Sequence, residues 1–234
     1  MKNRVNVFFA VAALLFLIPN ASLALWSYNQ DFEGLALPSE GALLGDNWLV
    51  FGNVFDSGGN YLYGYGPFDA PNDGAAFCAI VTGEGGAEQG MQQLAVYSDY
   101  NNGDHGLGNL IEANVFQEQL IGPGDVTEVW FFSWDAKLGN LEGGSTALGF
   151  IKTLDPNAGF ATTNFLTVDM TNIPNTWGSY LLYIFIDPSL DGQILQFGFL
   201  NTATNYEGSG VIYDNVRFYI SPVANEEMSF GAVK

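Results

Sequence analysis

Hydrophobic and polar residues alternate over short runs along most of this chain, and clusters of Gly, Asn and Asp separate the runs. The segment EVWFFSWDAK, residues 128–137, shows the alternation most clearly. Alternate side chains of a strand share a face, so we expect Trp130, Phe132, Trp134 and Ala136 to be buried together. Similar runs predict strands at 28–32, 48–54, 61–65, 75–82, 92–97, 114–120, 128–136, 147–154, 165–169, 178–186, 194–201 and 210–220.

Short strands joined by turns, with almost no helical periodicity, are typical of an all-β fold. The pattern predicts a β-sandwich or a β-barrel, and the length fits one domain over residues 25–221. The last residues, 222–234, lack periodicity, and we expect them to form a loose tail.

The run YLYGYGPF at residues 61–68 raises a separate question, because it places three tyrosines at alternating positions: Tyr61, Tyr63 and Tyr65. A strand here would put the three rings on one face, as a ligand platform or as a wall of the core. Leu62 and Gly64 offer little volume on the other face, so we expect the rings to pack at least partly inward. Tyr65 is followed by Gly-Pro and is the best placed of the three to reach a loop-built site.

Residues 1–24 have the layout of a secretory signal peptide. Lys2 and Arg4 precede an apolar run at 7–18, and small residues end the segment at Ala24. That run is short for a bilayer span, and no later segment is long and apolar enough to be an anchor. We expect cleavage before Leu25 and a secreted or periplasmic protein without membrane insertion.

The chain is strongly acidic. Its net charge is −19, and without Lys2 and Arg4 it becomes 4 − 25 = −21. Such a chain repels nucleic-acid phosphates and anionic lipid, so we expect neither as a partner. The acidity suits solubility or the binding of cations, and the sequence leaves both open. Cys78 is the single cysteine, in the apolar run AAFCAIV, so we expect it to be a small buried residue.

Five stretches, taken in order, resemble CenC-like carbohydrate-binding modules, which are jelly rolls of the galactose-binding-domain-like type. They are NQDFEGL at 29–35, DNW at 46–48, the segment 113–137, GQILQFGF at 192–199 and GSGVIYDNVRFY at 208–219. The resemblance extends over almost all of the chain after residue 27. It implies the fold, an antiparallel two-sheet β-sandwich of the jelly-roll type, more strongly than a ligand, because this fold serves many tasks.

The resemblance also implies a structural calcium ion. In such modules a Glu of the first-strand motif and an Asp of the last-strand motif share the ion with carbonyls of a middle loop. The matching residues here are Glu33 and Asp214, with the loop APNDG supplying Asn72 and Asp73. Calcium prefers six to eight oxygen ligands, which carboxylates and turn carbonyls provide. Alternatively, the two acids cap turns through hydrogen bonds to backbone amides.

Catalytic patterns are missing from the sequence. The acids Glu112, Glu118 and Glu128 are scattered, at what we expect to be loop and strand edges, rather than paired as in glycoside hydrolases. Four basic residues after residue 24 are few for a lyase acting on uronates. His105 is the single histidine, in a polar Gly-rich loop at 98–106 that lacks the closing Glu of a calcium loop. We therefore expect no enzyme.

Binding is the remaining class of function. Sugar rings pack their C–H faces on aromatic rings, and Asn, Asp and Tyr edges meet their hydroxyls. Tyr65, Tyr97 and Tyr100 lie among Asn and Asp, and we predict that they bind a polysaccharide or cell-surface glycan, most favourably a neutral one. The alternative is a structural surface or matrix protein that uses the same sandwich without a sugar.

Overall fold

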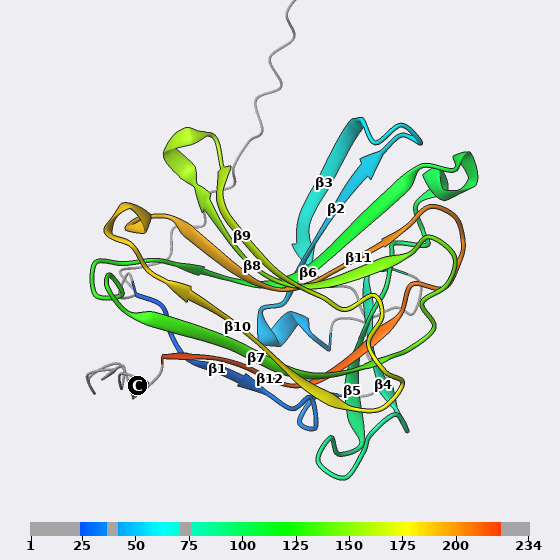
Figure 1. The fold of residues 1–234 in the computed structure, drawn as a ribbon, viewed down its shortest axis with the longest axis horizontal. Coiled ribbons are helices and arrows are strands. Elements are labelled where there is room, and N and C mark those ends of the chain that lie inside the picture. The colour runs from blue at the N-terminus through cyan, green and yellow to red at the C-terminus, as the bar shows by residue number, and fades with distance from the viewer. Residues whose placement is uncertain (1–23, 37–41, 71–75, 221–234) are drawn as a thin grey trace, which may run out of the picture.

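The computed structural model describes residues 24–36, 42–70 and 76–220, which form two antiparallel sheets packed face to face (Figure 1). In the β12 sheet the order is β10-β7-β12-β5-β4, and β1 also pairs with β12. In the β11 sheet the order is β3-β2-β6-β11-β8-β9. No helix in these ranges is long and apolar enough to cross a membrane.

The elements have the following bounds: β1 (Tyr28–Gln30), η1 (Leu44–Asp46), β2 (Leu49–Phe55), β3 (Tyr61–Asp69), β4 (Cys78–Thr82), β5 (Gln92–Val96), η2 (Gly103–Leu107), β6 (Leu110–Leu120), β7 (Val129–Leu138), β8 (Thr146–Asp155), η3 (Pro156–Ala158), β9 (Ala161–Asp169), β10 (Gly178–Phe185), η4 (Pro188–Leu190), β11 (Ile194–Ala203) and β12 (Val211–Ile220). Each predicted run overlaps one of these strands, so the predicted all-β, two-sheet antiparallel jelly roll is confirmed. Residues 1–23 of the predicted signal, Ala75 and the predicted tail lie outside the described residues.

The core fills the space between the two sheets, as the alternation in β7 predicted. Trp130, Phe132, Trp134 and Ala136 are all buried, and Cys78 is fully buried. Phe132 packs 5.7 Å from the ring of Phe199 on β11, so the two sheets meet through aromatic rings. The interior is thus rich in large rings, each of which removes much apolar surface from water.

The tyrosine run in β3 does not form one ladder. Tyr63 and Tyr65 pair with Val54 and Gly52, but a register shift follows, and Tyr61 pairs with Phe55 on the opposite face. A β-bulge of this kind reverses the side on which later residues lie. The expectation of three rings on one face was therefore wrong for Tyr61, which is 59% exposed.

Candidate functional site

The outer face of the β11 sheet, the side turned away from the β12 sheet, is strongly curved. Figure 1 shows the β2–β3 and β8–β9 hairpins rising away from the β12 sheet on either side of β6 and β11. A separate apolar cluster lies on this face, formed by Phe116, Phe150 and Leu200 with Leu49, Phe51 and Leu148 packed against it. The outer face therefore has an apolar floor between two raised flanks.

An exposed aromatic ring stands on each flank. Phe165 on β9 is 46% exposed, and its ring centroid lies 5.9 Å from that of Phe150. Tyr61 on β3 is packed edge-on against Phe55 at 5.7 Å. Between them, Gly198 pairs with both Phe116 and Phe150, and a Cβ there would come within 2.9 Å of the Phe116 Cβ. The lack of a side chain at Gly198 leaves room for the apolar cluster over the centre of the sheet.

A polar row crosses the face beside the apolar floor. Asn53 Nδ2 donates to Glu112 Oε1 at 2.8 Å, and Asn114 Nδ2 donates to the same oxygen at 3.0 Å. Asn114 is buried, and its Oδ1 atom has no hydrogen-bond partner among the described residues. A buried acceptor without a partner costs free energy unless a ligand or water supplies a donor.

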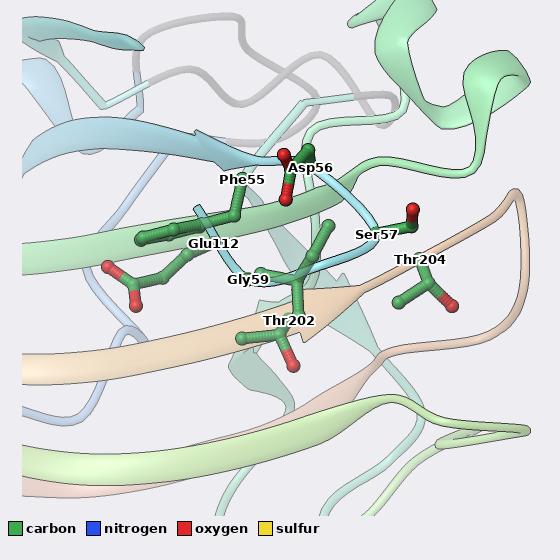
Figure 2. A pocket seen from close by; sticks show the side chains of 8 residues that line it. Phe55, Asp56, Ser57, Gly59, Glu112, Thr202 and Thr204 are labelled. Carbon is green, nitrogen blue, oxygen red and sulfur yellow. The ribbon is translucent and has the colours of Figure 1, made fainter. Parts of the chain in front are cut away.

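An open hollow of about 430 Å³ adjoins this row. Figure 2 shows Glu112 and Thr202 from β6 and β11 on one side and the β2–β3 turn, with Asp56, on the other. The Asp56 carboxylate accepts hydrogen bonds from the side chain and backbone of Asn60 and from the backbone of Gly58, and these bonds lower its pKa. The wall of the hollow is therefore a fixed turn.

A second row on this face contains polar side chains and one aromatic ring. Glu118, Gln196, Lys152 and Phe165 are paired in that order across β6, β11, β8 and β9. Gln196 Nε2 donates to Glu118 Oε2 at 2.8 Å, and Lys152 Nζ lies 5.5 Å from the Phe165 ring centroid. Burial lowers the pKa of the Lys152 ammonium. The row thus places an acceptor, a donor and an exposed aromatic ring side by side.

Sequence reasoning missed this face, and its expectation for two of the acids was wrong. Glu112 and Glu118 lie within β6, at alternate positions on the outer face, rather than at strand edges. The spacing of Glu112, Asn114 and Glu118 is the one available signal, since residues an even number apart in a strand share a face. Phe51 gave no such signal because its strand neighbours are apolar as well.

The three predicted ligand tyrosines meet at a different place, the segment that joins β5 to β6. Tyr65 donates its hydroxyl to Asp99 Oδ2 at 2.8 Å, and burial raises its pKa. Tyr97 and Tyr100 stack with centroids 6.0 Å apart, and His105 stacks on Tyr100 at 5.5 Å. The protein's own rings thus cover part of the surface that a sugar would use. Binding by these tyrosines remains a prediction.

His105 makes this segment sensitive to acid. It is buried, its Nε2 atom lies 3.2 Å from Ser98 Oγ, and burial lowers its pKa below the ordinary 6.5. The unfolded chain then binds the proton more readily than the folded chain, so stability must fall as the pH drops through about 6.5. Burial raises the pKa of Asp214 to about 7, and this shift acts in the opposite direction, so the effect of His105 is measured as a difference between two proteins. We expect the free energy of unfolding of the parent, relative to that of His105→Gln, to decrease between about pH 7 and pH 5 in urea titrations. A difference that does not change with pH would contradict the assignment.

Two of the predicted metal ligands come together on the outer face of the β12 sheet. β5 and β1 pair with the same edge of β12, and Asp214 lies between the two pairings. Glu33 follows β1, and its Oε1 atom accepts hydrogen bonds from Met91 N and Gln92 N at 2.6 and 2.7 Å. Within residues 24–36, 42–70 and 76–220, no three His, Cys, Asp or Glu side chains form a metal-sized group. Asp73 lies outside these ranges.

The surroundings of Asp214 suit a cation. Its side chain is 1% exposed, and its Oδ2 atom has no hydrogen-bond partner in the described structure. Burial, together with the carboxylates of Glu33 and Asp135, raises the pKa of Asp214 to about 7. Hydrogen bonds from Asn215 and Gln93 act in the opposite direction and lower this pKa. The Oε1 atom of Gln93 also has no such partner. A cation here would meet two unpartnered buried oxygens and neutralise repelling charges.

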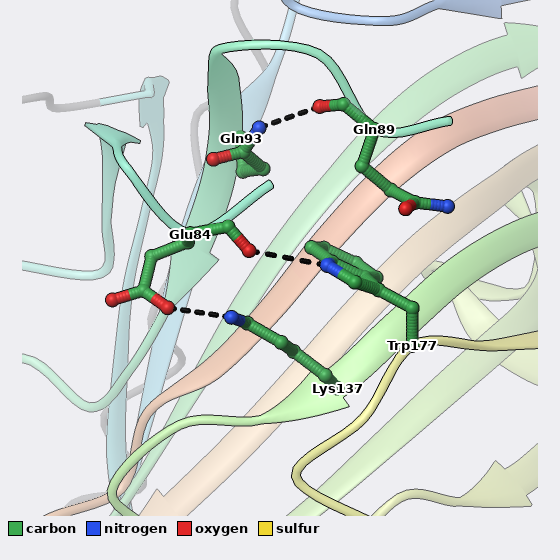
Figure 3. A network of polar contacts seen from close by, with 5 residues as sticks. All are labelled: Glu84, Gln89, Gln93, Lys137 and Trp177. Atoms are coloured by element: carbon green, nitrogen blue, oxygen red, sulfur yellow. Dashed lines mark hydrogen bonds and ion pairs between the residues drawn. The ribbon is translucent and has the colours of Figure 1, made fainter. Parts of the chain in front are cut away.

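The loop after β4, residues 83–90, covers this region (Figure 3). Trp177 Nε1 donates to the carbonyl oxygen of Glu84, and Lys137 Nζ lies 2.6 Å from Glu84 Oε2. Gln93 Nε2 donates to the carbonyl oxygen of Gln89 at 2.6 Å. These contacts hold the loop against the sheet.

No protein-family model matches the chain, and no curated protein is similar to it in sequence. Among solved structures, the chain is similar to the CBM22-2 xylan-binding domain of Xyn10C from Paenibacillus barcinonensis, with 12% identity, a TM-score of 0.43, and coverage of 83% of this chain and 99% of that one. The C-terminal family 22 carbohydrate-binding module of Xyn10B from Clostridium thermocellum gives 16% identity, a TM-score of 0.40, and coverage of 88% and 99%. The enzymatically active domain of tailspike protein 4 from bacteriophage CBA120 gives 14% identity and a TM-score of 0.45; 75% of this chain is covered, but only 20% of that chain.

Proposed function

We propose that the protein is a secreted, non-catalytic glycan-binding module, and that the outer face of the β11 sheet binds a neutral polysaccharide. The observation that carries the proposal is the arrangement of exposed rings, Tyr61 and Phe165, on both flanks of a curved face that combines an apolar floor with polar rows (Figure 1). Rings in such positions receive the C–H faces of sugars, and the amides and carboxylates between them pair with hydroxyls.

The positions of the acids on this face support binding rather than hydrolysis. Glu112 and Glu118 are six residues apart in β6, which corresponds to about 20 Å along a strand. Glycoside hydrolases place their two carboxyl groups roughly 5 to 10 Å apart. These two acids therefore cannot act together on one glycosidic bond, whereas each can accept a hydrogen bond from a different sugar unit of a chain.

The charge of the protein favours a neutral ligand. A net charge of −19, with Glu112 and Glu118 on the face itself, repels uronate and sulfate groups. Lys152 is the one basic residue in the row that contains Glu118. Acidic chains would need a bridging cation, while neutral β-glucans, mannans and xylans would not.

The test is calorimetry or affinity electrophoresis with these neutral polysaccharides, and with alginate and carrageenan as acidic controls. A well-packed ring contributes about 1 kcal/mol, so Tyr61→Ala and Phe165→Ala should each weaken binding about fivefold. The matched control is Tyr183→Ala, which removes a ring that is 64% exposed on the β12 sheet. It should leave affinity unchanged.

Two outcomes would contradict parts of the proposal. If Tyr65→Ala and Tyr97→Ala weaken binding while the Tyr61 and Phe165 variants do not, the ligand binds beside the β5–β6 segment. If only acidic glycans bind, and only with calcium, the charge argument is wrong.

The alternative, a structural surface or matrix protein, is favoured by an apolar patch on the β12 sheet. Leu181, Tyr183 and Phe185 on β10 are about half exposed or more, and the ring of Phe131 lies 6.0 Å from that of Tyr183. β10 is an edge strand, whose free backbone groups can pair with another chain. Concentration-dependent association that Tyr183→Lys abolishes, in a protein that binds no glycan, would support this alternative.

The fold is also proposed to hold calcium through Glu33 and Asp214. The support is the unpartnered, buried Asp214 Oδ2 atom and the like charge beside it. Calcium would join the segment after β1 to β12 and stabilise the sandwich, without a part in recognising sugar.

A further inference from the structure

The backbone nitrogen of Leu25 has an unusual partner. It donates a hydrogen bond to Asp125 Oδ2 at 2.8 Å, across a separation of 100 residues. Both residues are buried, Leu25 at 7% and Asp125 at 4% exposure. The next residue is fixed as well, because Trp26 N donates to Gln119 Oε1 at 2.9 Å and Gln119 Nε2 donates back to Trp26 O at 3.0 Å. The nitrogen of Leu25 is therefore held in position.

Asp125 is a buried carboxylate without a cation. Its Oδ2 atom accepts hydrogen bonds from two neutral amides, those of Leu25 and Gly122. Throughout the described ranges the one ion pair is Lys137 with Glu84, and Lys137 lies near the far end of β7. A buried carboxylate loses most of its hydration. When its only hydrogen-bond donors are neutral, no attraction to an opposite charge offsets the free-energy cost of that loss.

We propose that cleavage between Ala24 and Leu25 supplies that charge, by turning the Leu25 nitrogen into an α-ammonium that forms a buried ion pair with Asp125. A signal peptidase would hydrolyse the bond: water gives its oxygen to the new carboxylate of Ala24, and the Leu25 nitrogen takes up the protons. The nitrogen already lies at hydrogen-bond distance, so the pair needs no rearrangement. Charge-assisted hydrogen bonds are roughly twice as strong as neutral ones.

The geometry makes this effect specific to one cleavage site. An N-terminus at Ala24 would leave a neutral amide at Leu25, and an N-terminus at Trp26 would remove the nitrogen that reaches Asp125. The sequence pattern predicts cleavage after Ala24, and the buried Asp125 carboxylate contacts the nitrogen of the next residue, Leu25. Processing would then also complete the folded structure, independently of any sugar.

The experiment compares three chains that are each released from a cleavable fusion: one starting at Leu25, one starting at Leu25 with an acetylated nitrogen, and one starting at Ala24. Acetylation restores a neutral N–H at the same place and is the matched control. We expect the unfolding equilibrium constant in urea to be about tenfold lower for the free Leu25 chain than for the other two. Equal constants would overturn the proposal.

Asp125→Asn provides a second measurement. The substitution should raise the unfolding constant about tenfold more in the free Leu25 chain than in the acetylated one. Asp191→Asn, at an exposed carboxylate, should act equally on both. If Asp125→Asn prevents folding, the rate at which an acylating reagent modifies the N-terminal α-amine gives a separate test. This rate at pH 7 should be lower for the chain that starts at Leu25 than for the chain that starts at Ala24. Equal reactivity would show that Asp125 only closes the β6–β7 loop.

Discussion

Trp134→Ala is expected to lower the free energy of unfolding by about 3–5 kcal/mol. The indole is 1% exposed and lies 4.6 Å from the ring of Phe132 and 5.7 Å from that of Phe199. It also fills the space that Gly149 leaves on β8, where a Cβ would come within 2.4 Å of the Trp134 ring. Alanine would leave a cavity between the sheets that the rigid strands cannot close. Urea titration of both proteins measures the loss.

Trp134→Phe separates the effect of lost side-chain volume from the effect of losing the indole nitrogen. The indole Nε1 atom has no hydrogen-bond partner among the described residues, so phenylalanine removes an unpaired donor while it keeps much of the ring. We expect less than half the loss of the alanine variant. A loss below about 1 kcal/mol for Trp134→Ala would contradict the burial of this ring.

Calcium should raise the stability of the protein by about 2.7 kcal/mol at a free concentration of about 100 times its dissociation constant. The reason is that a cation between Glu33 and Asp214 binds the folded state, where the two acids meet, and not the unfolded chain. Melting curves in chelator and in millimolar calcium measure the effect. Coincident melting curves would contradict the proposal that calcium binds at Glu33 and Asp214.

Asp214→Asn should change the stability of the protein in opposite directions with and without calcium. In chelator the substitution should stabilise the protein, because it removes a buried charge close to Glu33 and Asp135. In calcium it should destabilise the protein relative to the parent, because a ligand is lost. Asp169→Asn, at an exposed carboxylate on β9, is the control and should show no such reversal. A variant that behaves the same in both solutions would indicate that Asp214 only accepts the backbone hydrogen bond from Asn215.

The fold could be predicted from the sequence where alternation and composition agreed. In β7 the large rings of Trp130, Phe132 and Trp134 lie at alternate positions, and the intervening positions include Ser133 and Asp135. The buried face could therefore be predicted without knowledge of the partner strands. In β3 the same rule failed, because the bulge that turns Tyr61 to the other face arises from pairing with β2. A local pattern cannot contain that information.

The candidate site was less predictable for a related reason. Residues on both faces of β8 are largely apolar, so Phe150, which lines the outer face, was not distinguishable from the core residue Ile151. The polar row depends on cross-strand pairs such as Asn53 with Glu112, which are 59 residues apart. Tyr61 and Phe165 became candidates only when the sheet curvature placed them on opposite flanks.

The pairing of β1 with β12 has a consequence for the order of folding. Asn29 and Arg217 are 188 residues apart, yet they lie side by side in the β12 sheet, and β12 is the strand with which β1 pairs. During synthesis β1 must wait until nearly the whole chain has left the ribosome before its partner exists. Closure of so long a loop is slow, so the sheet cannot be completed early. A delay of this kind would leave the β12 sheet without its β1–β12 pairing until synthesis is almost finished.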